Sequence, residues 1–410
     1  MSTINQPTYR VSLAGEKVAV HPSRVALAEE LDANGDHYVS DKEITKGYAI
    51  KEGRGSDVKG QVRETKYGLA KIVNPDVSAY HSYQEVGQAL KELEQQYPSL
   101  CERVSLGKSA LGREIWGLRI TEGADTEPAH QKTGVVITGC HHAREWMTVE
   151  VPIHSAQKLL EDQSPEGKER LAKSEIWIVP LVNPDGYEYS RQHDNMWRKN
   201  RQPVETIMDG EKIHSVGVDP NRNYDDHVRD HKHLYRTDND KPRVTIDDFE
   251  QGNDDPTSDV FRGTKGSSAP EVQAMLKLQL GHDNIRGVLD YHSYGETVMY
   301  PWGYTHRAPK NAKDLAAICK TFNHEAGGGL KVQQSVGMYA TLGSSNDIQF
   351  ANGIVGLTLE VNGCFQPRPS EILPTCERYT NGNISFIDSI IERAESGGLP
   401  ERTVVRQWKD

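Results

Sequence analysis

Nearly continuous apolar runs, each five to eight residues long, recur along most of the chain. They read GVVIT (134–138), EIWIVPLV (175–182), IRGVLDY (285–291) and IVGLTLEV (354–361). Runs of this kind are typical of strands buried on both faces of a largely parallel sheet. The stretch 80–100 instead repeats apolar residues at helical spacing. Strands separated by helices predict an α/β fold, with a mixed, largely parallel twisted sheet and helices on both faces.

The first 75 residues differ from the rest of the chain. They are polar and short of aromatic residues, and KEGRGSDVKGQ (51–61) has the composition of a solvated connector. We therefore place a boundary near Asn74–Pro75, with the main domain over 76–395 and a C-terminal tail over 396–410.

The charge balance limits the classes of partner. The 59 acidic residues outnumber the 48 basic ones, and the formal net charge is −11. This sign argues against nucleic acid or an anionic membrane as a partner. No stretch reaches the roughly 20 apolar residues of a membrane-spanning helix, and the opening residues lack the apolar core of a signal peptide. We expect no membrane segment and take the cytoplasm as the default compartment; export by a non-classical route stays open.

Charged side chains follow the predicted strands. The run 134–138 leads into His142 and Glu145, the run 285–291 into His292, and Glu360 lies near the end of the last run. In open α/β sheets, ligands bind outside the carboxyl ends of the strands. We therefore expect segments that are distant in the sequence to deliver polar groups to one edge of the sheet.

The spacing His142-x-x-Glu145 lets an imidazole and a carboxylate face one point. Catalytic zinc commonly takes three such ligands and keeps a fourth position for water. His292 can supply the third ligand from another strand end. We prefer His142 to its neighbour His141, because only His142 has a glutamate three residues later.

Six sequence blocks carry a family resemblance. They are GCHHAREWMTVE, LVNPDGYEYSRQHDNMWRKNRQ, VGVDPNRNYD, LDYHSYGETVMYPWGY, GMYATLGSSNDI and LTLEV. In order and approximate spacing they resemble the zinc metallocarboxypeptidases of the pancreatic carboxypeptidase A/B type. The resemblance covers residues 76–395 and implies the fold of that family, one catalytic Zn²⁺, and peptide or protein C-termini as substrates.

The resemblance also implies roles for individual residues. It makes His142, Glu145 and His292 the zinc ligands, with Asp219 orienting the His142 ring. Glu360 corresponds to the general base, and Arg198 to the group that stabilises the oxyanion. The groups around the substrate carboxylate are Arg144, Asn221, Arg222 and Tyr339. Arginines that would bind the C-terminal carboxylate of a substrate favour an exopeptidase, because the substrate of an endopeptidase presents no terminal carboxylate at the site.

Asn346 corresponds to the base of the pocket for the departing side chain. In the family this residue is apolar for apolar side chains and acidic for basic ones, and Asn346 is neither. Together with Gln334, Met338, Thr341 and Thr358, it predicts a moderately polar pocket of broad or unusual preference. A terminal diaminopimelate of a cell-wall peptide would be compatible with it.

A second metal motif lies in the N-terminal extension. Residues 32–43 read DANGDHYVSDKE, which matches the twelve-residue loop of an EF-hand. The expected calcium ligands are Asp32, Asn34, Asp36, Tyr38, Ser40 and Glu43. Position six, usually Gly because the turn needs positive φ, is His37. We expect a small helical EF-hand-like unit that binds Ca²⁺.

Two other functions remain as alternatives at this stage. One is a zinc amidohydrolase acting on cell-wall peptides or N-acyl amino acids, and the other is a non-catalytic calcium-responsive binding protein. The amidohydrolase could share the metal ligands, but Tyr339 and Asn221 fit a peptide carboxylate better. The complete ligand set and base argue against the non-catalytic protein. The sequence leaves the preferred C-terminal residue, any regulatory role of residues 1–75 and the oligomeric state open.

Overall fold

In the computed structural model the chain divides into two compact units, residues 1–75 and 76–410. The structure describes residues 77–408 apart from 127–128, 209–210 and 236–253. In the first unit it describes only strands, which are β1 (Arg10–Leu13), β2 (Glu16–Ala19), β3 (Tyr38–Val39), β4 (Gln61–Thr65) and β5 (Gly68–Ile72). Strand β1 pairs with β2 antiparallel and with β3 in parallel. The helices expected around residues 32–43 lie outside the described residues.

The second unit is built on an eight-stranded sheet of order β14-β13-β15-β12-β8-β9-β7-β6. The strands are β6 (Cys101–Lys108), β7 (Glu114–Ile120), β8 (Thr133–Gly139), β9 (Ser174–Val179), β12 (Ile285–Ser293), β13 (Thr297–Tyr300), β14 (Lys331–Gln334) and β15 (Val355–Val361). The four central strands β15, β12, β8 and β9 run parallel to one another. Strand β7 pairs antiparallel with β9, and β6 pairs antiparallel with β7. All four apolar runs of the sequence contain central strands, so the predicted fold class is confirmed.

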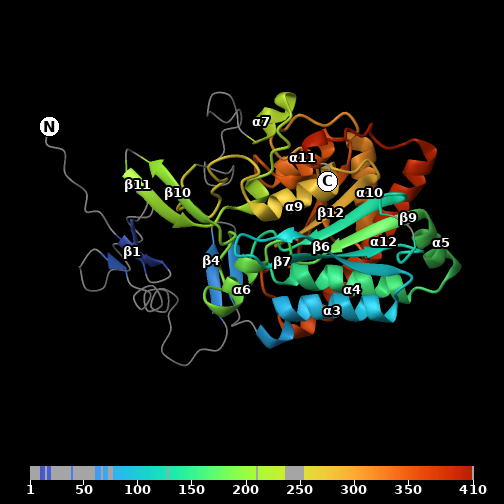
Figure 1. Cartoon of the computed structure of the whole chain (residues 1–410), viewed down its shortest axis with the longest axis horizontal. Helices are drawn as coiled ribbons and strands as arrows, with labels where there is room; N and C mark the ends of the chain where they lie inside the picture. Colours follow the sequence, from blue (N-terminus) through green and yellow to red (C-terminus); the bar gives the residue numbers. More distant parts are fainter. Residues whose placement is uncertain are drawn as a thin grey trace. The chain divides into compact units, whose positions relative to one another are not determined.

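Helices cover both faces of this sheet (Figure 1). The helices are α3 (Tyr83–Gln96), α4 (Met147–Glu161), α5 (Pro165–Lys173), α6 (Pro184–Gln192), α7 (Lys232–Tyr235), α9 (Pro270–Leu280), α10 (Ala312–Glu325), α11 (Ser345–Ala351) and α12 (Pro369–Ser396). Helices α3, α4, α10 and α12 pack on one face, and α9 and α11 on the other. A separate hairpin consists of β10 (Pro203–Met208) and β11 (Glu211–Val216). Among the described residues, no helix is both long and apolar enough to cross a bilayer.

Alternation along the central strands divides the core between the two faces. On β12, Leu289 and Tyr291 belong to the core under α4 and α12, whereas Val288 belongs to the core under α9 and α11. Successive strand residues point to opposite faces, so Asp290 and His292 share the face of Val288. The sheet therefore presents its polar strand ends on the α11 side.

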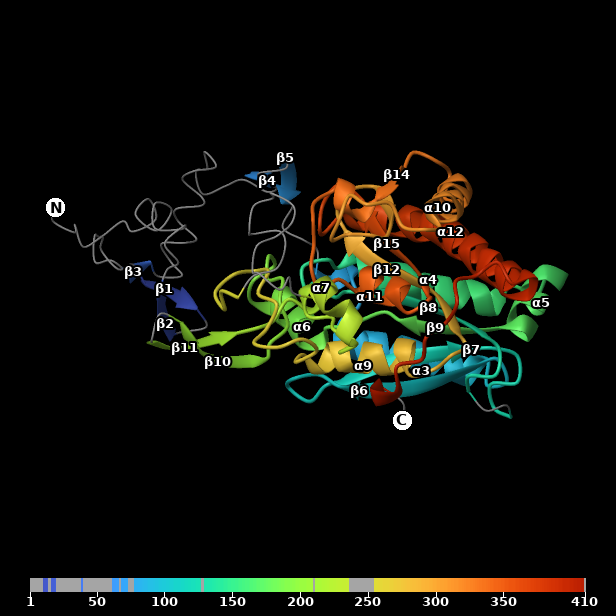
Figure 2. The same ribbon diagram turned by 90° about the horizontal axis from the view of Figure 1, so that it is seen from above.

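The last residues of the chain belong to the second unit. The short 3-10 helix η6 (Arg406–Trp408) lies beside α9, where the chain ends (Figure 2). Trp408 is buried, and Arg402 donates to the carbonyl oxygens of Gln279, His282 and Ile285. Residues 402–408 of the predicted C-terminal tail are thus packed on the sheet unit.

The start of α3 is anchored by a capping box and by an ion pair. Ser82 Oγ accepts from the backbone N–H of Glu85, whose side chain accepts from Ser82 N. Just before it, His81 Nδ1 lies 2.6 Å from Glu150 Oε2. This hydrogen bond raises the pKa of His81 above its ordinary value, and burial opposes it only in part.

We predict a pH-dependent stability contribution from His81. Because the folded-state pKa is raised, the contribution is full below the unfolded-state value of about 6.5 and is lost as pH rises through the folded-state value. The melting temperature of His81→Gln should therefore fall below that of the wild type at about pH 5.5 and approach it at about pH 8. Thermal unfolding across this range checks the prediction, and a pH-independent difference would contradict it.

Candidate metal centre and active site

Three side chains from two strand ends meet at one point. His142 and Glu145 follow β8, and His292 lies on β12. Glu145 Oε1 is 2.8 Å from His142 Nδ1, Glu145 Oε2 is 3.1 Å from His292 Nδ1, and the two Nδ1 atoms are 3.1 Å apart. The structure thus brings together all three residues that the sequence predicted as zinc ligands, and all are buried.

The turn after β8 holds His142 and Glu145 in place. A Cβ at Gly139 would lie 2.0 Å from the carbonyl oxygen of Thr148, so only glycine lets the strand end approach α4 this closely. The backbone N–H of Glu145 then donates to the carbonyl of His142, which closes a tight turn. Both side chains therefore face the carboxyl end of β12.

The outer nitrogens of both rings face carboxylates. His142 Nε2 lies 3.2 Å from Asp219 Oδ1, and His292 Nε2 lies 3.1 Å from Asp290 Oδ2. A carboxylate accepts a hydrogen bond from Nε2–H and so favours the tautomer whose Nδ1 lone pair points toward the centre of the site. Two such lone pairs and a carboxylate oxygen of Glu145 form the donor set that Zn²⁺ takes.

The charges of the site also fit a cation. Burial alone lowers the pKa of His292, but Asp290 and Glu145 outweigh it and raise the pKa well above its ordinary value. Burial likewise raises the pKa of Glu145, but His142 and His292 outweigh it and lower the pKa. The site therefore favours positive charge between the two rings, and a divalent ion supplies it.

Glu360 stands next to the metal ligands. On β15 it is paired in register with His292 of β12, and its side chain is 8% exposed. Burial, followed by the negative charge of Glu145, raises the pKa of Glu360 above its ordinary value. Such a carboxyl group can take up and release a proton near neutral pH.

Arg198 adds a fixed positive charge to this site. Its Nε donates to Asp219 Oδ2 at 2.8 Å, which places the guanidinium behind His142. Its buried Nη2 has no hydrogen-bond partner among the described residues. A buried N–H without a partner is costly, and a ligand oxygen would satisfy it.

A pocket opens beside these residues. Its lining consists of His142, Asn221, Arg222, His292, Met299, Ser335, Met338, Tyr339, Thr341, Ser344, Asn346, Thr358 and Glu360. Asn221 and Arg222 lie in the 3-10 helix η3 (Pro220–Arg222), and the guanidinium of Arg222 is 5.8 Å from the centre of the Tyr339 ring. Three of the four residues predicted to surround a substrate carboxylate therefore share one pocket.

The fourth residue, Arg144, lies elsewhere. Its guanidinium sits over the ring of Phe365 at 4.5 Å and donates to the carbonyl of Met196. Within the described part of the chain, Arg144 does not line the pocket. Its role at the substrate carboxylate therefore stays a prediction from the family resemblance.

The pocket floor is neutral. Asn346 Nδ2 donates to Ser335 Oγ at 2.8 Å, and Asn346 Oδ1 accepts from Ser344 Oγ at 2.9 Å. Met299, Met338, Thr341 and Thr358 form walls that carry no formal charge. Gln334 is not part of the lining, because its amide donates to the carbonyls of Trp302 and Thr305 instead.

Asp290 and His141 are polar residues of the site that sequence reasoning missed. Asp290 is fully buried and contacts the rings of both His292 and His141. The detectable signal was the spacing Asp290-x-His292 on a strand, because residues two apart point to the same face. The proposed calcium ligands Asp32, Asn34, Asp36, Ser40 and Glu43 lie outside the described residues, as does the side chain of Tyr38.

A hydrolytic metal centre at the carboxyl edge of an α/β sheet is the class that this geometry defines. The family model for zinc carboxypeptidases matches residues 86–382. The chain is 26% identical to mouse carboxypeptidase A4 over 335 residues, which cover 79% of this chain and 73% of the relative. It is 27% identical to carboxypeptidase B of the crayfish Astacus astacus over 319 residues, 75% of this chain and 95% of the relative.

A solved structure has the same fold. Carboxypeptidase A from Helicoverpa armigera matches with a TM-score of 0.64 at 21% identity, over 94% of this chain and 97% of that chain. The chain belongs to the zinc carboxypeptidase family. It is therefore a zinc-dependent metallocarboxypeptidase, a hydrolase.

The metal centre predicts one zinc ion per chain. Glu145→Gln removes the only anionic ligand of the three, so zinc affinity should fall by more than about 100-fold, beyond the loss typical of an outer-shell partner. The purified wild type should show a melting temperature that drops on chelation and recovers with added zinc. Metal analysis and thermal unfolding check both points; zinc retention by Glu145→Gln after dialysis against chelator would contradict the assignment.

Proposed function

We propose that this enzyme removes single residues from the C-terminus of peptides and proteins, with Glu360 as general base. The observation that carries the proposal is the register of β12 and β15, which pairs Glu360 with His292 in the lining of the pocket that also contains Arg222. When bound, zinc acidifies a water molecule and polarises the scissile carbonyl.

The residues of the chain divide the remaining work. Glu360 accepts a proton from the attacking water and passes it to the departing amine, a role that its raised pKa supports. The unpartnered Nη2 of Arg198 is suited to hydrogen-bond the carbonyl oxygen as that oxygen becomes negative. Fixed donors of this kind contribute about 3 kcal/mol to such reactions.

A second group of residues supports exopeptidase action. Arg222 offers a planar set of donors that matches a carboxylate, and Asn221 and Tyr339 line the same pocket. These groups would bind the free chain terminus and align the last peptide bond with Glu360. An amidated terminus lacks the charge that Arg222 pairs with.

The variant Glu360→Gln tests whether Glu360 is the general base. A peptide with an amidated C-terminus tests whether the enzyme requires a free chain end. The variant keeps its shape but cannot accept a proton, so kcat should fall by about 10³-fold or more while zinc content stays at one per chain. Wild-type enzyme should cleave a free-ended peptide and leave its C-terminal amide intact. Product analysis by mass spectrometry checks both points.

The matched control is Glu392→Gln, an exposed glutamate on α12, which should leave activity unchanged. Full activity of Glu360→Gln would show that Glu360 is not the general base. Cleavage of N-acyl amino acids but of no peptide would favour the amidohydrolase, and a zinc-loaded wild type inert toward every substrate would favour a non-catalytic protein.

We propose that the pocket prefers neutral side chains. Asn346 has both amide groups engaged by serines, and the walls carry no charge that would pair with a basic or acidic side chain. Asn346→Asp should place a negative charge at the floor and raise kcat/KM for C-terminal Lys and Arg by about 10- to 100-fold relative to neutral residues. Competition between peptides that differ only in the last residue measures the change, and an unaltered order of preference would contradict it.

We also propose that residues 32–43 bind one calcium ion. The spacing of their oxygen-bearing side chains supports this, although His37 replaces the usual glycine. Millimolar Ca²⁺ should raise the melting temperature of the full chain, and Glu43→Gln should abolish the effect, because it removes one oxygen of the bidentate ligand. Equal responses to Ca²⁺ in the wild type and the variant would refute the site.

A further inference from the structure

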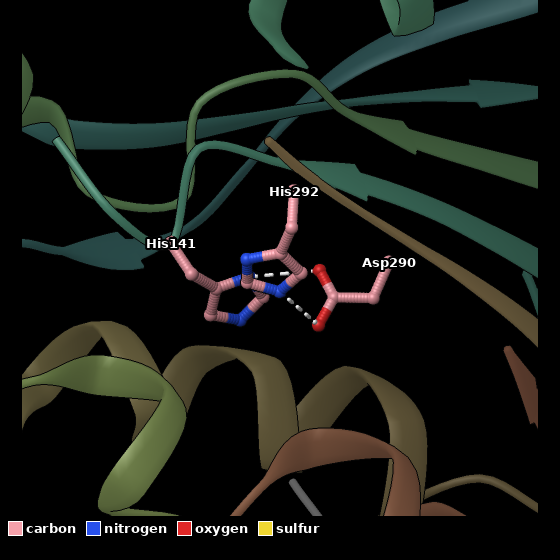
Figure 3. A group of neighbouring side chains, drawn as sticks. All are labelled: His141, Asp290 and His292. Carbon is pink, nitrogen blue, oxygen red and sulfur yellow. Dashed lines mark hydrogen bonds and ion pairs between the residues drawn. The ribbon is translucent and has the colours of Figure 1, made fainter. Parts of the chain in front are cut away.

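Asp290 is a buried carboxylate with neighbours at both oxygens. Its Oδ1 accepts from Thr138 Oγ1 at 3.0 Å and lies 2.9 Å from His141 Nδ1. Its Oδ2 accepts from Ser345 Oγ at 2.5 Å and lies 3.1 Å from His292 Nε2. Figure 3 shows the two imidazole rings lying over one another, with the carboxylate beside them and one dashed contact from each of its oxygens. The carboxylate thus bridges a zinc ligand to a histidine that the reaction does not use.

Two groups compete for the outer nitrogen of His292. Asn221 Nδ2 lies 3.0 Å from His292 Nε2, on the same side as Asp290 Oδ2. The amide of Asn221 cannot turn away, because its Oδ1 accepts from the backbone N–H of Ser345 at 2.8 Å. An amide N–H beside Nε2 favours an unprotonated Nε2, and this leaves the proton on Nδ1, where it blocks metal binding. A carboxylate favours the opposite tautomer.

His141 contacts the Oδ1 atom of Asp290. Its ring is fully buried, and its Nε2 lies 2.7 Å from the hydroxyl of Tyr224. If Tyr224 donates there, the His141 proton is on Nδ1, facing Asp290. The Nδ1 contact is short but not a linear hydrogen bond, so its contribution is mainly electrostatic. The chain Tyr224–His141–Asp290 therefore restrains the carboxylate at its Oδ1 atom.

We propose that Asp290 is a positioning residue that keeps the proton of His292 on Nε2 and the Nδ1 lone pair toward the metal, with His141 fixing Asp290. The inference rests on the proposed zinc site. It gives each histidine ligand its own carboxylate, since Asp219 faces His142 in the same way. The carboxylate thereby overrides the tautomer that Asn221 would select.

A second cation among His141, Asp290 and His292 is the competing interpretation of the same cluster, because these residues also bring three ligand atoms together. The hydroxyls of Thr138 and Ser345 already occupy lone pairs of both Asp290 oxygens. A cation at His292 Nε2 would also have to displace the proton that the metal-bound ring carries there. The arrangement therefore favours a hydrogen-bonded support, and metal stoichiometry separates the two interpretations.

The test measures zinc affinity by chelator competition in the full-length protein. Asp290→Asn should weaken zinc binding by about 10- to 100-fold, the range typical of outer partners of a ligating histidine. His141→Phe keeps a ring of similar shape and should weaken it by a smaller factor, so the proposal stays testable if Asp290→Asn does not fold. With Co²⁺ in place of zinc, the visible spectrum of Asp290→Asn should differ from that of the wild type.

Asp226→Asn is the matched control. Asp226 is also fully buried and bonds a histidine, His231 at 2.6 Å, and the amide of Asn352 at 2.7 Å. This variant should lose thermal stability without a change in zinc affinity or in the Co²⁺ spectrum. If Asp290→Asn behaves like Asp226→Asn, the role of Asp290 is only structural and the proposal fails.

Two further outcomes would overturn the proposal differently. Two zinc ions per wild-type chain, one of them lost in His141→Phe, would establish the second cation site instead. If the wild type binds no zinc, both the metal centre and the proposed function are wrong. If the wild type is active with one zinc and the variants bind zinc equally well, only the role of Asp290 is wrong.

Discussion

The ionised groups buried in this site must be balanced by opposite charges and hydrogen bonds, because bulk solvent does not reach them. Four carboxylates, from Glu145, Asp219, Asp290 and Glu360, are buried at the carboxyl edge of the sheet. Two guanidiniums, from Arg198 and Arg222, are buried near them. Ionised groups in such a place cost several kcal/mol each unless opposite charges and hydrogen bonds compensate them. When all four acids are ionised the cluster lacks two positive charges, which is the charge of one zinc ion.

The sheet makes this concentration of charge possible. Parallel strands bring side chains that are about 150 residues apart in the chain to one edge, as the pairing of β8 with β12 illustrates. Apolar residues on alternate positions, such as Leu289 and Tyr291, anchor the same strand in the opposite core. The polar side chains are therefore held by rigid neighbours, and the site needs little reorganisation to receive a metal.

Sequence reasoning recovered the features that local patterns encode. Apolar run length predicted the central strands, and the spacing of His142 and Glu145 together with the family resemblance predicted the metal-facing residues. Asp290 escaped because its role depends on which way the His292 ring turns, and a single sequence does not specify ring orientation. The family resemblance grouped Arg144 with Arg222, but a single sequence does not reveal that the ring of Phe365 lies against its guanidinium. Packing of the last residues on α9 likewise depends on contacts between distant segments, which local patterns do not reveal.

With Glu360 as the proposed base, activity would depend on the correct register between β12 and β15. Pairing of His292 with Glu360 holds in one alignment of the two strands. A slip by one residue would turn Glu360 into the core under α4 and α12 and bring a leucine or valine to its place. A slipped chain could remain compact and helical, with near-normal circular dichroism. The active fraction recovered after refolding therefore counts correctly paired molecules, which bulk measures of secondary structure would overestimate.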